Sequence, residues 1–276
     1  MKDCKTIVAA LVVAVSPVFA GFANANVSYD DSVYAYGAYY QLKPDGGDSY
    51  DFYGGTIGYA HKFSDTFSIQ GEFTYMNAST SESYHTYSND SDFQENYYEY
   101  YDEDESFYTL ELMCGLGKRQ IISLGVEYMY LSEEYSYESD GSYTTKGTVW
   151  DTESMDVTYS TSESEHRIFA KARVGYPFEI FSRGNQSLKI TPSLAFGAGV
   201  AIPGDSKVHS SEYGDDWETE SSEGFSYKGD GRCSISYSYK QHSIVIEGGY
   251  HILGVVDNGN YYSTGFYGRA GYAFSW

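Results

Sequence analysis

Positive charge is scarce in this sequence of 276 residues, which has 17 Lys and Arg against 39 Asp and Glu and a formal net charge of -22. Nucleic-acid backbones are held by patches of Lys and Arg, so this balance excludes a nucleic-acid partner. Proline is also rare, with 5 residues beside 29 Gly. The chain is 41% hydrophobic and has 32 Tyr and 15 Phe, which excludes intrinsic disorder. Strand-forming aromatics are frequent and helix formers are few, and the sequence therefore predicts an all-β protein.

The apolar run at the N-terminus is too short to cross a bilayer as a helix. It extends from Ile7 to Val15, whereas a membrane helix needs about 20 apolar residues. Basic residues precede it, and Pro17 and several small residues follow it. This is the pattern of a secretory signal peptide over residues 1–25, cleaved after Ala20 or after Ala25.

Cysteine is nearly absent from the mature chain. Cys114 and Cys233 lie on strands that are predicted to be far apart, so we expect small apolar surface residues and no disulfide. Cys4 precedes the apolar run and is not placed for lipid attachment.

Ten segments of the mature chain alternate in the manner of β-strands. They cover residues 33–42, 52–63, 67–78, 107–118, 121–131, 167–181, 187–202, 226–239, 243–256 and 261–276. Tight turns join them at 64–66, 119–120, 182–186 and 240–242, and longer connections, at 43–51, 79–106, 132–166, 203–225 and 257–260, alternate with these turns. In an antiparallel meander every second connection lies at the same end, so the short turns share one rim. This is the layout of an outer-membrane barrel, and residues 26–276 are predicted to form one transmembrane antiparallel up-and-down β-barrel with ten strands, or eight or twelve if a segment is miscounted.

Each predicted strand has an apolar face and a polar face. Leu110, Leu112 and Ile246 belong to the apolar set, and Gln70 and Lys189 belong to the polar set. A soluble barrel buries the first set and a membrane barrel buries the second. The signal peptide, the loop asymmetry and the aromatic residues near strand ends favour the membrane barrel, in a bacterial outer membrane.

The last strand carries the most specific motif. It ends with Arg269, Ala270, Gly271, Tyr272, Ala273, Phe274, Ser275 and Trp276. This ending resembles the terminal strand of bacterial outer-membrane proteins, although their usual last residue is Phe. The chain thus resembles the small outer-membrane β-barrel superfamily, which includes opacity-type adhesins, the membrane domain of outer-membrane protein A, porin-like barrels and the ten-stranded omptins. The resemblance implies that Gly271, Phe274 and Trp276 form the signal read by the barrel-assembly machinery, and that lipid and lipopolysaccharide surround the barrel.

Charged residues on the polar face are predicted to form a belt across the lumen. The acids Glu72, Glu111 and Glu127 fall on the third to fifth strands, and the bases are Arg173, Arg232 and Arg269. A barrel of about eight strands is just filled by side chains, so ten strands should leave at most a thin water path. Because an unpaired buried charge is costly, we expect ion pairs across the lumen that close it. A selective conduit for small ions is the alternative.

The long connections are acidic and rich in Tyr and Ser. Residues 79–106 contain nine Asp and Glu and no Lys or Arg, and 132–166 and 203–225 repeat the pattern. The simplest interpretation is a solvated acidic surface. Recognition of host or matrix ligands is the functional alternative, because Tyr and Ser suit binding loops. The four carboxylates from Asp102 to Glu105 lack the spacing of a calcium loop, so no metal ligand and no cofactor is predicted.

Catalysis is the class with least support. An omptin-type protease needs paired Asp and an Asp–His pair, and the chain offers only scattered His85, His166 and His209 near Asp90, Asp92, Asp215 and Asp216. No catalytic residue is assigned, and the protein is predicted not to be an enzyme. We therefore expect, in order, a surface protein acting in adhesion, recognition or envelope integrity, a narrow porin-like channel, and an outer-membrane hydrolase of omptin type.

Overall fold

The computed structural model describes residues 31–44, 49–89, 93–117, 121–145, 151–154, 157–211, 217–218, 223–256 and 260–276. The predicted signal peptide and the turn at 119–120 lie outside these ranges. None of the described residues forms a helix that is long and apolar enough to cross a membrane. The strands are β1 (Asp31–Pro44), β2 (Tyr50–Ser64), β3 (Phe67–Asn89), β4 (Phe93–Leu116), β5 (Ile122–Thr145), β6 (Asp151–Ser154), β7 (Val157–Gly175), β8 (Phe178–Arg183), β9 (Gln186–Ser210), β10 (Trp217–Glu218), β11 (Gly224–Tyr239), β12 (His242–Val256) and β13 (Asn260–Ser275).

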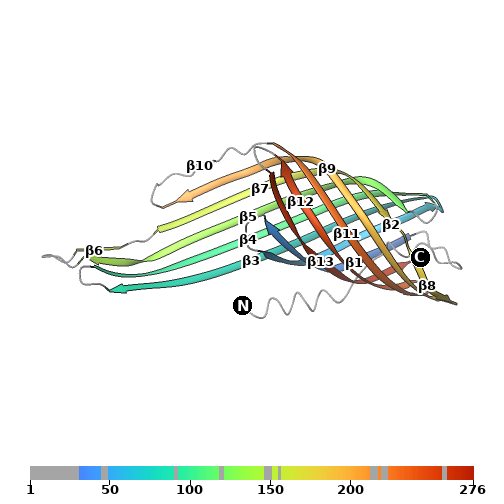
Figure 1. Cartoon of the computed structure of the whole chain (residues 1–276), viewed down its shortest axis with the longest axis horizontal. Helices are drawn as coiled ribbons and strands as arrows, with labels where there is room; N and C mark the ends of the chain where they lie inside the picture. The colour runs from blue at the N-terminus through green and yellow to red at the C-terminus, as the bar shows by residue number, and fades with distance from the viewer. Residues whose placement is uncertain are drawn as a thin grey trace.

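The strands close into one antiparallel barrel (Figure 1). Neighbours in sequence pair around the wall, and β1 closes it by pairing with β13 from Ser32↔Ser275 to Pro44↔Ser263. β8 continues β7 after a break at Pro177 and pairs with β9, so the two count as one strand of the wall. β6 and β10 are short additions on β5 and β9. The wall therefore has ten strands, and the predicted up-and-down barrel is confirmed.

The tight turns lie together at one end. The Thr66 carbonyl accepts a 2.9 Å bond from the Gly117 amide, and the Asn185 carbonyl accepts another from the Lys240 amide. Gly184 and Lys240 adopt positive φ values of 59° and 53°, which such turns require. The C-terminal residue joins this rim through two backbone bonds between Asp31 and Trp276.

Side chains alternate between an apolar exterior and a polar interior. Phe196 is 66% exposed and Ile246 is 61% exposed, whereas Lys189 is 1% exposed and Gln70 is 2% exposed. Aromatic residues gather on the exterior near both ends, as in Tyr108–Tyr130 and Tyr176–Phe178 with ring centroids 4.9 Å apart. This is the surface of a transmembrane barrel, and the predicted choice of faces is confirmed.

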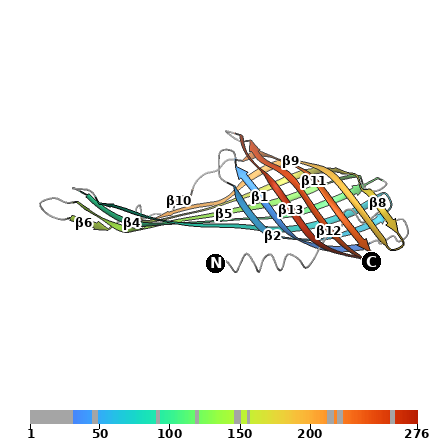
Figure 2. The same cartoon turned by 60° about the horizontal axis from the view of Figure 1, so that its bottom comes forward.

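The strands β3, β4, β5, β7 and β9 extend well beyond the rest of the wall (Figure 2). On the β2 side, pairing with β3 ends at Tyr53↔Asn77, but β3 continues with β4 to Asn89↔Gln94. On the other side, pairing with β11 ends at Gly224↔Ala201, but β9 continues with β7 to Tyr159↔Ser210. We call the part of β3, β4, β5, β7 and β9 beyond these pairs the projecting sheet. It contains the residues Ala78–Asn89, Phe93–Glu105, Glu133–Thr145, Val157–Glu165 and Ile202–Ser210.

The projecting sheet corrects the prediction of loops at 79–106, 132–166 and 203–225. Most of these residues form strands instead. Tyr, Thr and Ser alternate with acids there. A strand with this pattern pairs well with an antiparallel neighbour once the register between the two strands is fixed. The segment Ala78–Asn89 alone is about 40 Å long at about 3.4 Å per residue.

Candidate functional site

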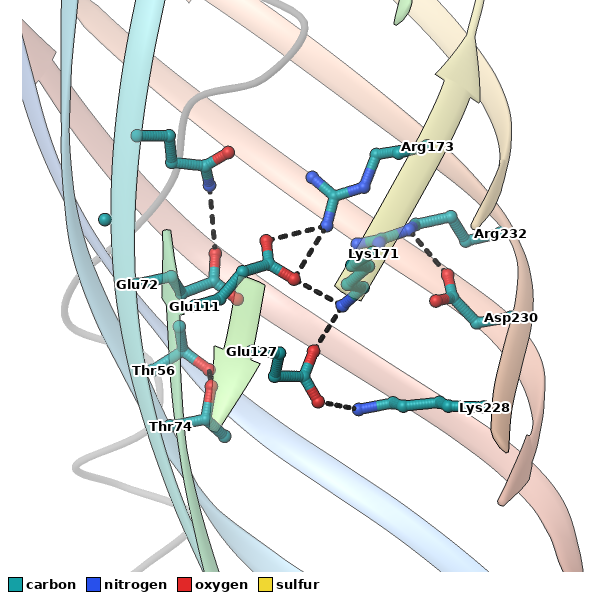
Figure 3. Close-up of polar contacts among 12 residues, drawn as sticks. Thr56, Glu72, Thr74, Glu111, Glu127, Lys171, Arg173, Lys228, Asp230 and Arg232 are labelled. Atoms are coloured by element: carbon teal, nitrogen blue, oxygen red, sulfur yellow. Dashed lines mark hydrogen bonds and ion pairs between the residues drawn. The ribbon is translucent and has the colours of Figure 1, made fainter. Parts of the chain in front are cut away.

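An ion-pair network crosses the lumen at the predicted belt (Figure 3). Glu72, Glu111 and Glu127 are directly opposite one another on β3, β4 and β5, so three like charges lie in one row. The Lys171 ammonium bonds to the carboxylates of both Glu111 and Glu127. Arg173 donates to Glu111 at 2.8 Å. The repulsion within the acidic row is thereby offset by cations from β7, the strand that pairs with β5.

The other half of the network connects β11, β12 and β13 to this row. Arg269 donates to Glu72 at 2.8 Å and to Glu247 at 2.8 Å. Arg232 lies 3.3 Å from Glu247 and 2.9 Å from Asp230. The structure thus places all six predicted belt residues in the lumen, in two ion-paired groups that meet where Glu72 and Glu111 lie opposite one another.

Four further members were not assigned to the belt from the sequence. Lys228 bonds to Glu127 at 2.5 Å, and Lys171, Asp230 and Glu247 complete the set. Residues 228 and 230 lie an even number of positions from Arg232, so their side chains point to the same face of β11. This alternation is the signal that could have identified Lys228 and Asp230 as lumen residues. With them, five carboxylates face five cations: Glu72, Glu111, Glu127, Asp230 and Glu247 against Lys171, Arg173, Lys228, Arg232 and Arg269.

An apolar layer lies directly beyond the network, toward the projecting sheet. Its buried residues include Phe52 at 1% exposure, Met76 at 0% and Phe107 at 5%, with Met129 and Leu253 beside them. The Phe52 and Phe107 rings are 5.3 Å apart between centroids. A charged layer and an apolar layer therefore fill the same lumen one above the other.

Small cavities remain on both sides of the network. One of about 60 Å³ lies between the network and the apolar layer, and it is lined by Thr109 and His251 among others. A second, also of about 60 Å³, lies toward the turns and is lined by Ser193 and Ser234. Arg173, Arg232 and Arg269 line both cavities, so these three side chains separate them.

The mouth at the projecting-sheet end of the barrel lies beyond the apolar layer and is acidic. A cavity of about 280 Å³ is lined by Phe52, Phe107 and Leu131 and by four carboxylates, those of Glu105, Glu133, Glu163 and Glu165. Desolvation, followed by the charges of Glu133 and Glu103, raises the pKa of Glu105 to about 7. Desolvation and nearby carboxylates also raise the pKa of Glu133. Arg167 is the cation in this cavity lining and bonds to Glu165 at 2.6 Å.

The projecting sheet presents tyrosines and carboxylates together. On the face that continues the lumen, Tyr101 and Tyr137 both donate to Glu99, at 3.2 and 3.1 Å, and their rings are 5.0 Å apart. The hydroxyl of Tyr50, at the start of β2, donates to Glu103 of the projecting sheet at 3.0 Å. The opposite face carries exposed Asp102 and other acids. No group of three or more His, Cys, Asp or Glu among the described residues is arranged to hold a metal ion.

The histidines considered for catalysis lie on strands and have neutral partners where a bond is seen. His85 contacts Asn96 at 2.7 Å, and His166 contacts Tyr128 at 2.7 Å. His209 lies on β9 opposite Ser160. Asp90, Asp92, Asp215 and Asp216 lie outside the described residues.

The residues of the C-terminal motif occupy both faces of β13. Phe274 and Trp276 share the outer face, with ring centroids 5.8 Å apart, and Trp276 is 48% exposed. Gly271 lies opposite Tyr36 of β1. The cysteines Cys114 and Cys233 are both free thiols, as predicted.

The chain is similar to solved outer-membrane proteins at low sequence identity. No protein-family model and no curated protein sequence matches the chain. Among solved structures, the outer membrane protease OmpT from Escherichia coli is 10% identical, with a TM-score of 0.35 over 91% of this chain and 99% of that one. The CymD monoaromatic hydrocarbon channel is 9% identical, with a TM-score of 0.29 over 96% and 98%. The P. putida toluene transporter TodX is 7% identical, with a TM-score of 0.14 over 90% and 89%. At these scores the likenesses carry no argument about function.

Proposed function

We propose that the protein is a non-enzymatic surface protein of a bacterial outer membrane that recognises ligands through its projecting sheet. The apolar exterior of the barrel supports insertion in a bilayer, with lipid and lipopolysaccharide around it. Short turns face the periplasm in such barrels and longer connections face outward, so the projecting sheet stands on the cell exterior. Among families, this description fits the small opacity-type barrels.

One observation carries this proposal: five strands continue beyond the rim into a sheet whose two faces present Tyr and carboxylates. The rest of the barrel wall ends without such an extension, so closure of the barrel does not require it. Tyr offers large, rigid contact area with a polar tip, and a ligand that is held here needs cationic groups to match the carboxylates. Host or matrix proteins with basic surfaces are the ligands we expect, and Gly271, Phe274 and Trp276 are proposed to direct assembly of the barrel.

A shortened barrel tests the proposal. Three two-residue Asn-Gly turns would replace residues 78–105, 133–163 and 202–223, because Asn77↔Ser106, Ser132↔Ser164 and Ala201↔Gly224 are already opposite one another. Heat-modifiable gel mobility confirms that the variant folds. Proteoliposomes with the intact protein should bind to a poly-lysine surface and to cultured epithelial cells, and those with the shortened barrel should not. Equal binding by the two proteins would overturn the proposal.

A narrow channel is the second candidate, and the paired cavities favour it. Among the described residues, only Arg173, Arg232 and Arg269 lie in the lining of both, so movement of these residues would join the two spaces. Conductance of the refolded protein in planar bilayers tests this function. Steady openings that change ion selectivity on Arg232→Glu would support the channel, and a silent barrel would leave recognition as the function.

A further inference from the structure

The projecting sheet has two outer strands, and one of them is protected against further pairing. On β9, Pro203 has no amide hydrogen to donate, and the register with β7 shifts between Glu163 and Glu165. β10 then covers Lys207 and Val208. Proline, an irregular register and a short covering strand are the means by which natural sheets block strand addition at an edge.

The edge of β3 has none of these features. From Ala78 onward, β3 pairs only with β4 among the described residues, and that register runs without a shift to Asn89. The stretch Thr80–Thr86 contains no Pro, Lys or Gly, and its side chains are exposed apart from the partly exposed Thr86. A straight, regular strand with one unpaired side is a template for another strand.

The groups that face the open side follow from the hydrogen-bond pattern. The Thr66 carbonyl, directly before β3, accepts a bond from the Gly117 amide, directly after β4, and in an antiparallel ladder alternate residues point their backbone groups to the same neighbour. Even-numbered residues of β3 therefore bond to β4. The amides and carbonyls of Ser79, Ser81, Ser83 and His85 point to the open side.

The acids of β4, the strand next to this edge, determine the charge of a segment that would bind to the edge. Ser79 and Ser81 lie opposite Asp104 and Asp102, and Thr80 and Tyr84 lie opposite Glu103 and Glu99. Acidic residues of β4 thus lie next to the edge strand on both faces of the projecting sheet. Beyond the rim, β3 and β4 contain no Lys or Arg. An added strand would lie about 10 Å from β4, two strand spacings away, which is within reach of Lys and Arg side chains.

We propose that the open edge of β3 binds an extended, Lys- or Arg-rich peptide segment of another protein as an additional strand. This inference rests on the proposed recognition function and specifies its partner and mode of binding. Main-chain bonds to Ser79, Ser81, Ser83 and His85 supply the pairing, and the acids on β4 select a basic segment. A second copy of the chain is a poor occupant, because edge-to-edge pairing would bring Glu82 and the acids of two β4 strands together.

The experiment uses the full-length protein in detergent micelles and a synthetic peptide of alternating Lys and Thr. A second peptide of the same sequence is N-methylated at every other residue, so it keeps its charge but cannot complete the ladder. The protein variant Ser81→Pro with Ser83→Pro removes two outward amides without loss of any bond to β4. The matched control, Ser81→Ala with Ser83→Ala, keeps them.

The unmodified peptide should bind to the wild type and to the alanine control, and it should slow hydrogen exchange at Ser79, Ser81 and Ser83. Methylation of the peptide, or the two prolines, should weaken binding about tenfold or more. Equal binding of the two peptides, or no effect of the prolines, would overturn the strand-addition mode while the shortened-barrel test still supports recognition. Dimerisation through this edge in ultracentrifugation would overturn the choice of partner.

Discussion

Strands β4 and β5 carry inward-facing acids at two levels, in the lumen and at the mouth, and the two sets differ in what surrounds them. In the lumen, Glu111 and Glu127 are 5% and 2% exposed and are each held by two cations. At the mouth, Glu133 and Glu163 are exposed and Glu105 is partly exposed, and the cation in their cavity, Arg167, bonds to Glu165. Pairing is required where a charge is buried and can be omitted where it is solvated. The excess negative charge is accordingly concentrated outside the barrel, where it is available to a ligand.

The largest expected effect comes from removal of a cation in the lumen. Lys171→Met leaves Glu111 and Glu127 in one buried row with one cation each, so we expect a loss of about 3–5 kcal/mol in the free energy of unfolding. Urea titration in lipid, followed by gel mobility, measures it. The control is Lys207→Met on the exposed part of β9, which should change stability by less than about 0.5 kcal/mol. Equal effects of the two changes would remove the distinction between lumen and projecting sheet.

A change in conductance is expected when one complete ion pair is removed from the network. Glu111→Ala with Arg173→Ala deletes a cation and an anion together and takes away one of the three side chains between the two small cavities. Openings should become more frequent in planar bilayers than for the wild type, while the folded gel mobility is retained. A wild type that conducts as well as the variant would show that the network does not close the lumen.

The carboxyl groups at the mouth should produce a smaller change in stability, and this change should depend on pH. The pKa of Glu105 is raised from 4.5 to about 7, so between these values the folded protein holds a proton that the unfolded chain has released. The stabilisation is complete below about pH 4.5 and is lost as the pH rises through 7. After allowance for solvent screening, roughly 1 kcal/mol is expected. Hydrogen exchange of β4 beyond the rim should be slower near pH 5 than near pH 8, after correction for the intrinsic pH dependence of exchange.

Two variants check the origin of this pH dependence. Glu105→Gln should reduce the difference, leaving the part that comes from the raised pKa of Glu133, and Glu138→Gln on the opposite face of β5 should leave it unchanged. An unchanged difference in Glu105→Gln would assign the effect to another carboxyl group.

The smallest effect is expected at the C-terminus. Trp276→Phe keeps an aromatic ring beside Phe274 on the outer face of β13, so the rate of barrel assembly in vivo should stay the same or rise slightly. Phe274→Ser is the contrasting change and should slow assembly. If Trp276→Phe were as slow as Phe274→Ser, the proposed signal of Gly271, Phe274 and Trp276 would depend on the indole itself.

The barrel could be predicted from the sequence because its determinants are local. Alternation of apolar and polar residues locates a strand, and the short turns reveal which ends lie together. The six belt residues were predicted in the same way, because each lies on the polar face of its strand. Lys228 was missed because its partner Glu127 lies on β5, and that contact forms only when the barrel closes, whereas Asp230 lies two residues from its partner Arg232 on β11 and could have been found.

The projecting sheet was not predicted because the composition of its segments is typical of loops, whereas their pairing makes them strands. Segments such as residues 79–106 are acidic and, apart from Tyr, contain one hydrophobic residue, Phe93, which is typical of loops. Their strand structure depends on register that is fixed inside the membrane region, where Glu72↔Glu111 and Glu111↔Glu127 align the neighbours. Once aligned, each strand extends outward along its partner with alternating Tyr, Ser and acids.

The continuity of β3, β4, β5, β7 and β9 from the turns to the projecting sheet has a mechanical consequence. A ligand that pulls on the tip pulls along the strand axes, and the hydrogen bonds between strands lie perpendicular to that direction. Such tension loads many bonds in shear at once, whereas a sideways pull at an edge would break them one after another. Force applied at the cell surface would thus be distributed along the wall of the barrel down to its opposite rim.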